Sequence, residues 1–207
     1  MSLESLLQRA DLWRGGEPVR RGPAGVPTGS EALDAELPGG GWPRGALTEL
    51  LLARPGAGEL GLLLPALARL SAEDRWLAWI DPPHLPYAPA LASAGIDPAR
   101  TLLVRPGRTD NSAEMLWAME QALRAGTCGA VLGWPAAPNH RALRRLQLAA
   151  EHGAAVGILF RPLSAADQAS PAALRLRLEP AAGGLRLHLL KRRGGWGVRP
   201  IFLPTVV

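Results

Sequence analysis

The chain has 207 residues, of which 47% are hydrophobic and 20% are charged, and its formal net charge is +5. This composition is typical of a globular protein and excludes wholesale disorder. No apolar run is long enough to cross a membrane, and the N-terminus, which carries Glu4 and Asp11, lacks the pattern of a secretory signal. The single cysteine, Cys128, cannot form an internal disulfide, so the expected compartment is the cytoplasm.

Lysine and arginine together number 23, against 18 acidic residues, and Lys191 is the only lysine. A basic excess of this size permits contact with nucleic acid but does not require it. The standard phosphate-binding P-loop needs a Gly-Lys-Ser/Thr triplet. Since the chain contains no such triplet, a standard P-loop is excluded.

The first 25 residues are predicted to lie apart from the main domain. Residues 1–13 have the apolar spacing of a short amphipathic helix, whose apolar face includes Leu3, Leu6 and Leu7. Residues 14–25 are rich in glycine, proline and arginine, as linkers are. We therefore expect an N-terminal helix and linker over 1–25 and one domain over 26–207.

Apolar runs and helical patterns alternate along most of the domain. The expected strands cover residues 46–53, 76–81, 101–105, 128–134 and 155–161. The expected helices cover residues 31–36, 59–71, 87–95, 111–125 and 139–152. Thr28 or Ser30 is suited to cap the first helix. This alternation predicts βαβ units and a mostly parallel sheet flanked by helices.

The end of the domain has a different pattern. Residues 173–179 and 185–191 alternate strictly, with leucines on one face. The opposite face carries Arg175, Arg177, Arg186 and His188. With Gly183 and Gly184 between them, these runs predict a half-exposed antiparallel hairpin. The tail after it either adds a short edge strand or lies outside the sheet.

A glycine-rich loop follows the first expected strand, at the end of a parallel sheet where ligands bind. Gly56 and Gly58 are placed as in a phosphate cradle. However, Glu59 and Leu60 stand where lysine and a metal-binding hydroxyl are needed. A carboxylate repels a polyphosphate, and leucine cannot hold a metal ion. We predict a degenerate loop without a nucleotide cofactor or a metal.

Two further strand ends bear on catalysis. Asp81 and His84 form a weak acid–base signal, because prolines stiffen the loop between them. Gly133 stands where an NTPase places a magnesium-binding aspartate. No catalytic residue is assigned.

Basic side chains gather at two places that could contact a partner or phosphates. One is the helix expected at 139–152, which carries Arg141, Arg144 and Arg145. The other is the end of the hairpin, with Lys191, Arg192, Arg193 and Trp196. Together with the N-terminal leucines, these are the candidate contact residues.

Tryptophans offer a second signal for partner surfaces. Trp76, Trp79 and Trp117 are expected in or near the core, the last because it shares a helical stripe with Leu116 and Glu120. Trp13, Trp42 and Trp196 lie in glycine-rich or terminal segments. If exposed there, a tryptophan would mark a partner surface, and packing at the edge of the core is an equal alternative.

The residues from Val26 to Leu50, VPTGSEALDAELPGGGWPRGALTEL, resemble the segment that leads into the P-loop of RecA recombinases. The residues from Ala78 to Pro106 resemble the RecA strand–helix–strand that follows. The resemblance covers about 25–203 and implies a RecA-like core. The resemblance implies that Glu59 and Leu60 replace the lysine and threonine of the P-loop. It also implies that Pro83 replaces the catalytic glutamate and that Gly133 replaces the magnesium-binding aspartate. The connections that correspond to the RecA DNA-binding loops, 135–139 and 162–171, are short.

Within this superfamily, the chain most resembles the ImuA family of RecA-like accessory proteins in damage-induced mutagenesis. The resemblance is carried by the motifs LDAELPGGGWP, PPHLPYAPAL, RALRRLQLAAE and LKRRGG. Some ImuA relatives are grouped with SulA, a cell-division inhibitor with a reduced RecA-like fold. The resemblance implies a non-enzymatic adaptor in SOS-induced translesion synthesis, associated with the nucleoid during repair. Its implied partners are an ImuB-type Y-family polymerase homologue, an error-prone C-family polymerase and RecA, with weak DNA binding.

Two alternatives follow from the same resemblance. One is SulA-like inhibition of division by binding of the FtsZ GTPase. The other is an ATP-dependent recombinase or recombination mediator, which only the fold supports.

Overall fold

The computed structural model describes residues 24–207 except residues 57, 107–111, 136, 193–198 and 205–207. The strands are β1 (Ala46–Leu52), β2 (Trp76–Ile80), β3 (Thr101–Val104), β4 (Cys128–Gly133), β5 (Val156–Pro162), β6 (Leu174–Ala181), β7 (Gly184–Lys191) and β8 (Ile201–Pro204). The helices are α2 (Glu31–Asp34), α3 (Leu64–Ala72), α4 (Ala88–Ser93), α5 (Ser112–Arg124) and α6 (His140–Gly153), with short 3-10 helices η1 (Pro98–Arg100) and η2 (Leu163–Ala165).

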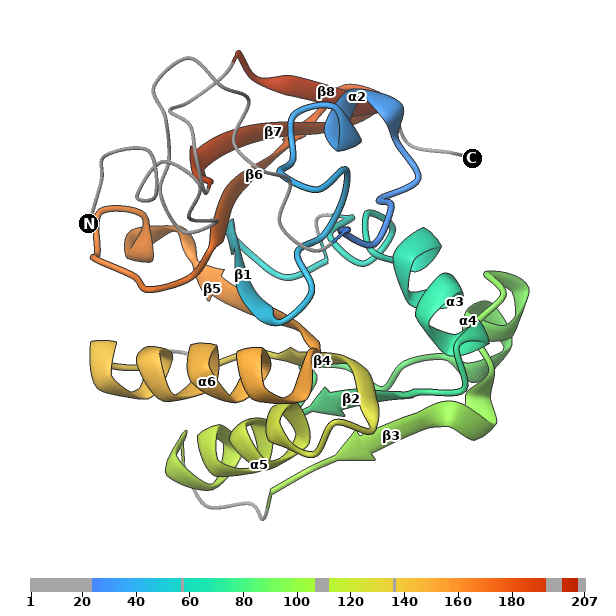
Figure 1. Ribbon diagram of the computed structural model, residues 1–207. Coiled ribbons are helices and arrows are strands. Elements are labelled where there is room, and N and C mark those ends of the chain that lie inside the picture. The colour runs from blue at the N-terminus through green and yellow to red at the C-terminus, as the bar shows by residue number, and fades with distance from the viewer. Residues whose placement is uncertain (1–23, 57, 107–111, 136, 193–198, 205–207) are drawn as a thin grey trace, which may run out of the picture.

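All eight strands form one sheet in the order β3-β2-β4-β5-β1-β6-β7-β8 (Figure 1). Every pairing from β3 to β6 is parallel, and β7 and β8 then pair antiparallel. The predicted α/β class, with a mostly parallel sheet and a C-terminal antiparallel hairpin, is confirmed. The tail contributes the edge strand β8.

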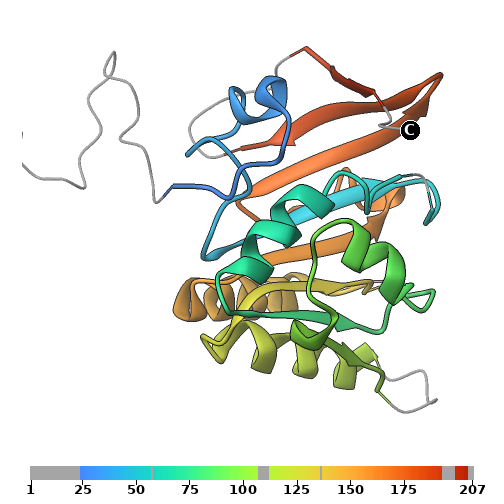
Figure 2. The same cartoon turned by 90° about the vertical axis from the view of Figure 1, so that its right-hand side faces the viewer.

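Helices cover both faces of the parallel part of the sheet. In Figure 2, α3 and α4 lie toward the viewer, and α5 and α6 lie behind the strands. Each face has its own core: Leu50 packs with α3 and α4, whereas Leu47 packs with α5 and α6. Because both faces are buried, β1, β4 and most of β5 are buried at consecutive positions. Within the described part of the chain, no helix is long and apolar enough to cross a membrane.

The helix expected at 59–71 begins only at Leu64. Turns occupy the residues before it, and Pro65 lies in its first turn, where a missing N–H group is harmless. Glu59 lies before this helix, and its side chain accepts a hydrogen bond from the backbone N–H of Gly56 in the preceding glycine loop. In α2, Ser30 rather than Thr28 is the N-cap residue.

Two tryptophans, Trp76 and Trp117, are more exposed than expected. Trp42, in the glycine-rich segment, is fully buried in the core on the α3 face, which is the core-packing alternative, and its backbone pairs with Val26 in an isolated β-bridge. Trp76 is partly exposed, and Trp117 is 61% exposed. In α5 the buried stripe is formed by Met115, Met119 and Leu123, so Trp117 lies outside it. Trp79 is buried, as expected.

Arg175, which was expected on the exposed face of the hairpin, lies in the interior instead. It is buried and binds Glu49, a carboxylate in the centre of β1 with no exposure to solvent. Arg175 Nε donates to Glu49 Oε2 at 2.7 Å, and Arg161 Nη1 of β5 donates to Glu49 Oε1 at 2.9 Å. Ser170 Oγ donates to the same Oε1 at 2.8 Å. This network joins β1, β5 and β6 to the connection between the last two.

The helices α5 and α6 approach each other closely at their carboxyl ends. A Cβ atom at Gly153 would lie 2.0 Å from the carbonyl oxygen of Leu123. Arg75 donates to the carbonyl oxygens of Gly126 at 3.0 Å and Gly153 at 3.1 Å. Glycine at 153 is therefore required by close packing. These contacts hold the two helices together at their carboxyl ends.

Cys128 opens β4 and is 4% exposed. Burial raises the pKa of its thiol above the ordinary value, against the opposing effect of a hydrogen bond with Thr127. The thiol is therefore neutral and shielded at physiological pH.

We predict that Ala154→Gly raises the free energy of unfolding by about 1 kcal/mol, because Ala154 ends α6 in the left-handed region with φ 51°, where glycine has no Cβ to clash. Urea denaturation followed by circular dichroism measures the change. The control is Ala118→Gly inside α5, which we expect to lower stability by about 1 kcal/mol. Equal losses from both substitutions would contradict the argument.

Glu49→Gln is expected to lower the free energy of unfolding by about 3–5 kcal/mol, because it leaves two buried guanidinium groups without a counter-charge. The matched control is Glu179→Gln in β6. Glu179 pairs with His188 at 3.0 Å, but its side chain is 39% exposed, so we expect a change below about 1 kcal/mol. Comparable losses in the two variants would show that Glu49 is not a structural centre.

Candidate functional site

The glycine-rich loop after β1 binds the carboxylate of Glu59, a residue of the chain itself. Gly56 and Gly58 have positive φ angles of 82° and 95°, conformations that favour glycine. The backbone N–H of Gly56 donates to Glu59 Oε1 at 2.8 Å. Glu59 is 4% exposed. The carboxylate thus takes a donor that a phosphate oxygen would need, and it places negative charge where a polyphosphate would bind.

The position of the magnesium-binding aspartate is closed as well. A Cβ atom at Gly133 would lie 2.4 Å from Sδ of Met119. Met119 extends from α5 and is fully buried. An aspartate at this position would have to displace a core methionine and bury its charge among apolar side chains. The catalytic-glutamate position is Pro83, on the loop that follows β2.

Aromatic rings stack near the carboxyl ends of three adjacent strands. The ring of Trp134, just after β4, lies 4.5 Å from that of Phe160 in β5 at an interplanar angle of 12°. On its other side it stacks on Trp79 of β2 at 6.1 Å and 22°. These rings belong to or pack against the apolar core on the α3 face. Apolar rings therefore occupy part of the sheet end at which α/β proteins bind ligands.

Asp81 and His84 add no catalytic group to this site. Both side chains are exposed on the loop after β2. Asp81 has φ 49° and its N–H donates to the carbonyl oxygen of Val104 at 2.8 Å, so its unusual conformation serves the turn out of the sheet. Among the residues that the structure describes, no group of His, Cys, Asp or Glu is placed to hold a metal ion.

One of the expected contact surfaces is exposed to solvent. Arg141, Arg144 and Arg145 are exposed on α6. Arg145 forms an ion pair with Glu120 of α5, which also accepts a hydrogen bond from Arg124 at 3.2 Å. The sequence did not identify Glu120 as a binding partner for these arginines. The sequence carried a signal for this ion pair: a glutamate that shares a helical stripe with apolar residues is expected to be buried, and a buried carboxylate requires a nearby cation.

The second expected surface is only partly described, and its cations have structural contacts. Lys191 Nζ donates to the carbonyl oxygen of Ser170 at 2.7 Å. Arg192 Nη1 lies 3.0 Å from Glu36 Oε2 and joins the end of β7 to the α2 region. The remaining candidates, Leu3, Leu6, Leu7, Arg193 and Trp196, lie outside the described residues. As contact residues, all of these stay predictions.

Comparison with known proteins gives one family. The model of the family described as "Cell division inhibitor SulA" matches residues 45–157, more than half of the chain. The match runs from just before β1 to the first residues of β5. The residues from 158 onward, with β6, β7 and β8, lie outside it.

Individual relatives carry the same description. The SulA of Edwardsiella piscicida is 39% identical over 106 residues, which are 50% of this chain and 60% of that protein. The SulA of Yersinia enterocolitica serotype O:8 is 31% identical over 134 residues, which are 64% of this chain and 78% of that protein. Thus the chain spans about 60% of the length of the first of these relatives. The crystal structure of SulA from Pseudomonas aeruginosa matches with 30% identity and a TM-score of 0.45, over 56% of this chain and 97% of that one.

From the closed loop we predict no saturable binding of Mg-ATP to this protein, measured by isothermal titration calorimetry. The double variant Glu59→Lys, Leu60→Thr, which supplies the two missing loop residues, is expected to bind none either. The reason is that Met119 still fills the space beside Gly133 and the loop beyond β2 still lacks the glutamate. A RecA recombinase serves as the positive control. Saturable binding by the unmodified chain would overturn this account of the loop.

Proposed function

The chain belongs to the SulA family, and from this premise we propose that it regulates cell division in the cytoplasm by binding and inhibiting another protein. The family is described as one of inhibitors, which is a non-enzymatic role. The observation that carries the proposal is the closure of the nucleotide site. Because Glu59 takes a backbone donor of the glycine loop, and Pro83 and Gly133 stand in place of the catalytic and metal-binding residues, we expect the fold to offer its outer surfaces to partners rather than a cleft to a substrate.

The partner assigned by this proposal is FtsZ, the GTPase of cell division. The relatives named above support it, since each is described as a cell division inhibitor. An ATP-dependent recombinase or mediator is not proposed, because the loop after β1 holds a carboxylate in place of the required lysine. The division into 1–25 and 26–207 remains part of the proposal, with the N-terminal segment as an accessory to the domain.

A second candidate function is the translesion-synthesis adaptor of the ImuA type. The observation that favours it is the length of the fold beyond the matched region. Strands β6, β7 and β8 extend the sheet past residue 157, and the LKRRGG motif stands at the end of β7. The partners in this case are the Y-family polymerase homologue, the error-prone C-family polymerase and RecA, with weak DNA binding.

We predict that the GTPase rate of FtsZ falls as this protein is titrated in, and that the decrease saturates at a fixed ratio of the two proteins. Binding removes FtsZ from the pool that hydrolyses GTP, so the rate follows the fraction bound. A GTPase unrelated to division, assayed with the same protein, controls for contaminants. The measurement is phosphate release at constant GTP.

A pull-down from DNA-damaged cells distinguishes the two candidates. An unaltered FtsZ rate, together with enrichment of a Y-family polymerase homologue or an error-prone polymerase, would replace division inhibition by the adaptor function. Enrichment of FtsZ without the polymerases would support the first candidate.

A further inference from the structure

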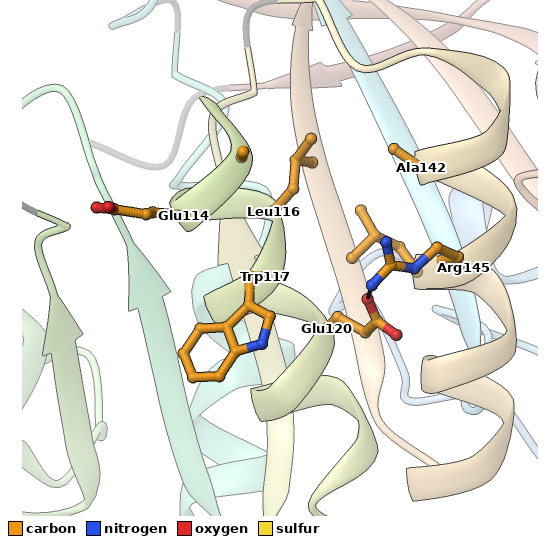
Figure 3. Close-up of a pocket in the computed structure, with 8 residues that line it drawn as sticks. Glu114, Leu116, Trp117, Glu120, Ala142 and Arg145 are labelled. Carbon is orange, nitrogen blue, oxygen red and sulfur yellow. Dashed lines mark hydrogen bonds and ion pairs between the residues drawn. The ribbon is translucent and has the colours of Figure 1, made fainter. Parts of the chain in front are cut away.

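A groove of about 430 Å³ lies between α5 and α6, on the outer surface of the molecule (Figure 3). Its lining includes Leu116, Trp117 and Glu120 from α5 and Ala142, Arg145 and Leu146 from α6. All of these lie in the amino-terminal two-thirds of the two helices. At their other ends the helices are locked together by the contact between Gly153 and Leu123. The groove therefore lies between elements whose relative position is fixed.

The groove leaves a large apolar side chain uncovered. Trp117 is 61% exposed and stands on the α5 side of the groove. On the same outer surface of α6, Leu148 is 51% exposed and follows Arg144 and Arg145 by one helical turn. An exposed tryptophan beside an apolar groove is the arrangement that protein partners use as an anchor.

Around the groove, four arginines outnumber the two lining glutamates, Glu114 and Glu120. Glu120 lies at its base, and its side chain is 9% exposed. It pairs with Arg145 and Arg124, whose side chains are 59% and 55% exposed. Each guanidinium carries five N–H donors and gives one of them to Glu120, so most of its donors face outward. Arg141 and Arg144 add two exposed cations on α6.

We propose that this groove, named here the α5–α6 groove, binds an acidic amphipathic segment of a partner protein. An apolar side chain of that segment packs on Trp117 and Leu116, and its carboxylates pair with the outward donors of Arg145 and Arg124. Helices with one apolar face and one charged face bind grooves of this kind. The proposal deepens the proposed function, on which it rests, by naming the surface and the chemistry of the segment it takes.

A protein segment fits the groove better than nucleic acid does. Leu116, Ala142 and Leu146 give the groove an apolar floor, which has no use for a phosphate backbone. Nucleic acid is therefore an outcome of the test and not part of the proposal.

The test uses the full chain and a fluorescein-labelled synthetic peptide with leucines and one phenylalanine at helical spacing and glutamates elsewhere. A matched peptide carries lysine in place of every glutamate, and a single-stranded DNA of similar charge is the third probe. Fluorescence anisotropy measures binding. We expect the acidic peptide to bind and to weaken as salt rises, because its ion pairs lie near the surface. The lysine peptide and the DNA are expected to bind at least about tenfold less tightly, about the change that one lost ion pair with a charged partner group produces.

Two variants locate the binding. Trp117→Ala and Arg145→Gln are each expected to weaken the acidic peptide by about tenfold or more. The matched controls are Trp76→Ala and Arg177→Gln, which change a partly exposed tryptophan and a partly exposed arginine away from the groove. We expect these to bind like the unmodified chain. Circular dichroism establishes that each variant is folded.

Three results of the binding assay would overturn the proposal: equal binding of the acidic and lysine peptides, binding of DNA alone, or acidic-peptide binding that Trp117→Ala and Arg145→Gln leave unchanged. Self-association of the chain that Trp117→Ala abolishes, without peptide binding, would assign the groove to a second copy and also overturn it. The peptide assay contains no FtsZ and no polymerase. Its outcome is therefore separate from that of the GTPase assay, and each hypothesis can fail without the other.

Discussion

Glu49 occupies the centre of β1 without contact with solvent, and the rest of the sheet is arranged around its charge. A carboxylate there is unfavourable unless cations from neighbouring strands reach it. Arg161 supplies one from β5, and Arg175 supplies the other from β6. Arg175 also donates to the carbonyl oxygens of Ala165 at 2.7 Å and Ala166 at 3.1 Å. The charge therefore ties β1 to β5, to β6 and to the short connection between those two strands.

This connection corresponds to one of the DNA-binding loops in the RecA resemblance. In the present chain it is short, contains η2, and is held against the sheet by Ser170 and Gln168, which bind Glu49 and Arg161. A segment whose polar groups are occupied by the interior has few donors left for a phosphate backbone. The same principle explains the loop after β1, where Glu59 accepts a donor internally. In both places the polar groups of the chain are occupied by contacts within the chain itself.

Much of the fold could be predicted from the sequence, because parallel strands buried on both faces produce apolar runs that the helical stretches separate. The strand bounds in the structure differ from the expected ones by about one residue, as at β1 and β5. Helix faces were harder to predict. In α5 one stripe carries Met115, Met119 and Leu123, and another carries Leu116, Trp117 and Glu120, and both have helical spacing. The packing of α6 decides which stripe is buried, and that contact is not local in sequence.

The candidate site could be predicted only in part. The absence of lysine from the loop was visible, whereas the packing of Met119 against Gly133 and the stacking of the aromatic rings depend on elements far apart in the chain. Glu49 offered a signal that was missed. A single carboxylate inside an apolar strand indicates a buried cation elsewhere, and Arg161 at the end of another strand was the available candidate. The division-inhibitor alternative was visible through the fold relation, and the relatives favour it over the adaptor.

The burial of Cys128 has a practical consequence. Since this thiol is the single one in the sequence, is shielded at the start of β4 and has a raised pKa, it reacts slowly with alkylating probes. A cysteine introduced at an exposed position, such as Leu148, would then be the fast-reacting thiol in the folded protein. Spectroscopic labels could be attached to a chosen face of the native chain without first removing the natural cysteine, and the distances between that face and a bound protein could be measured in solution.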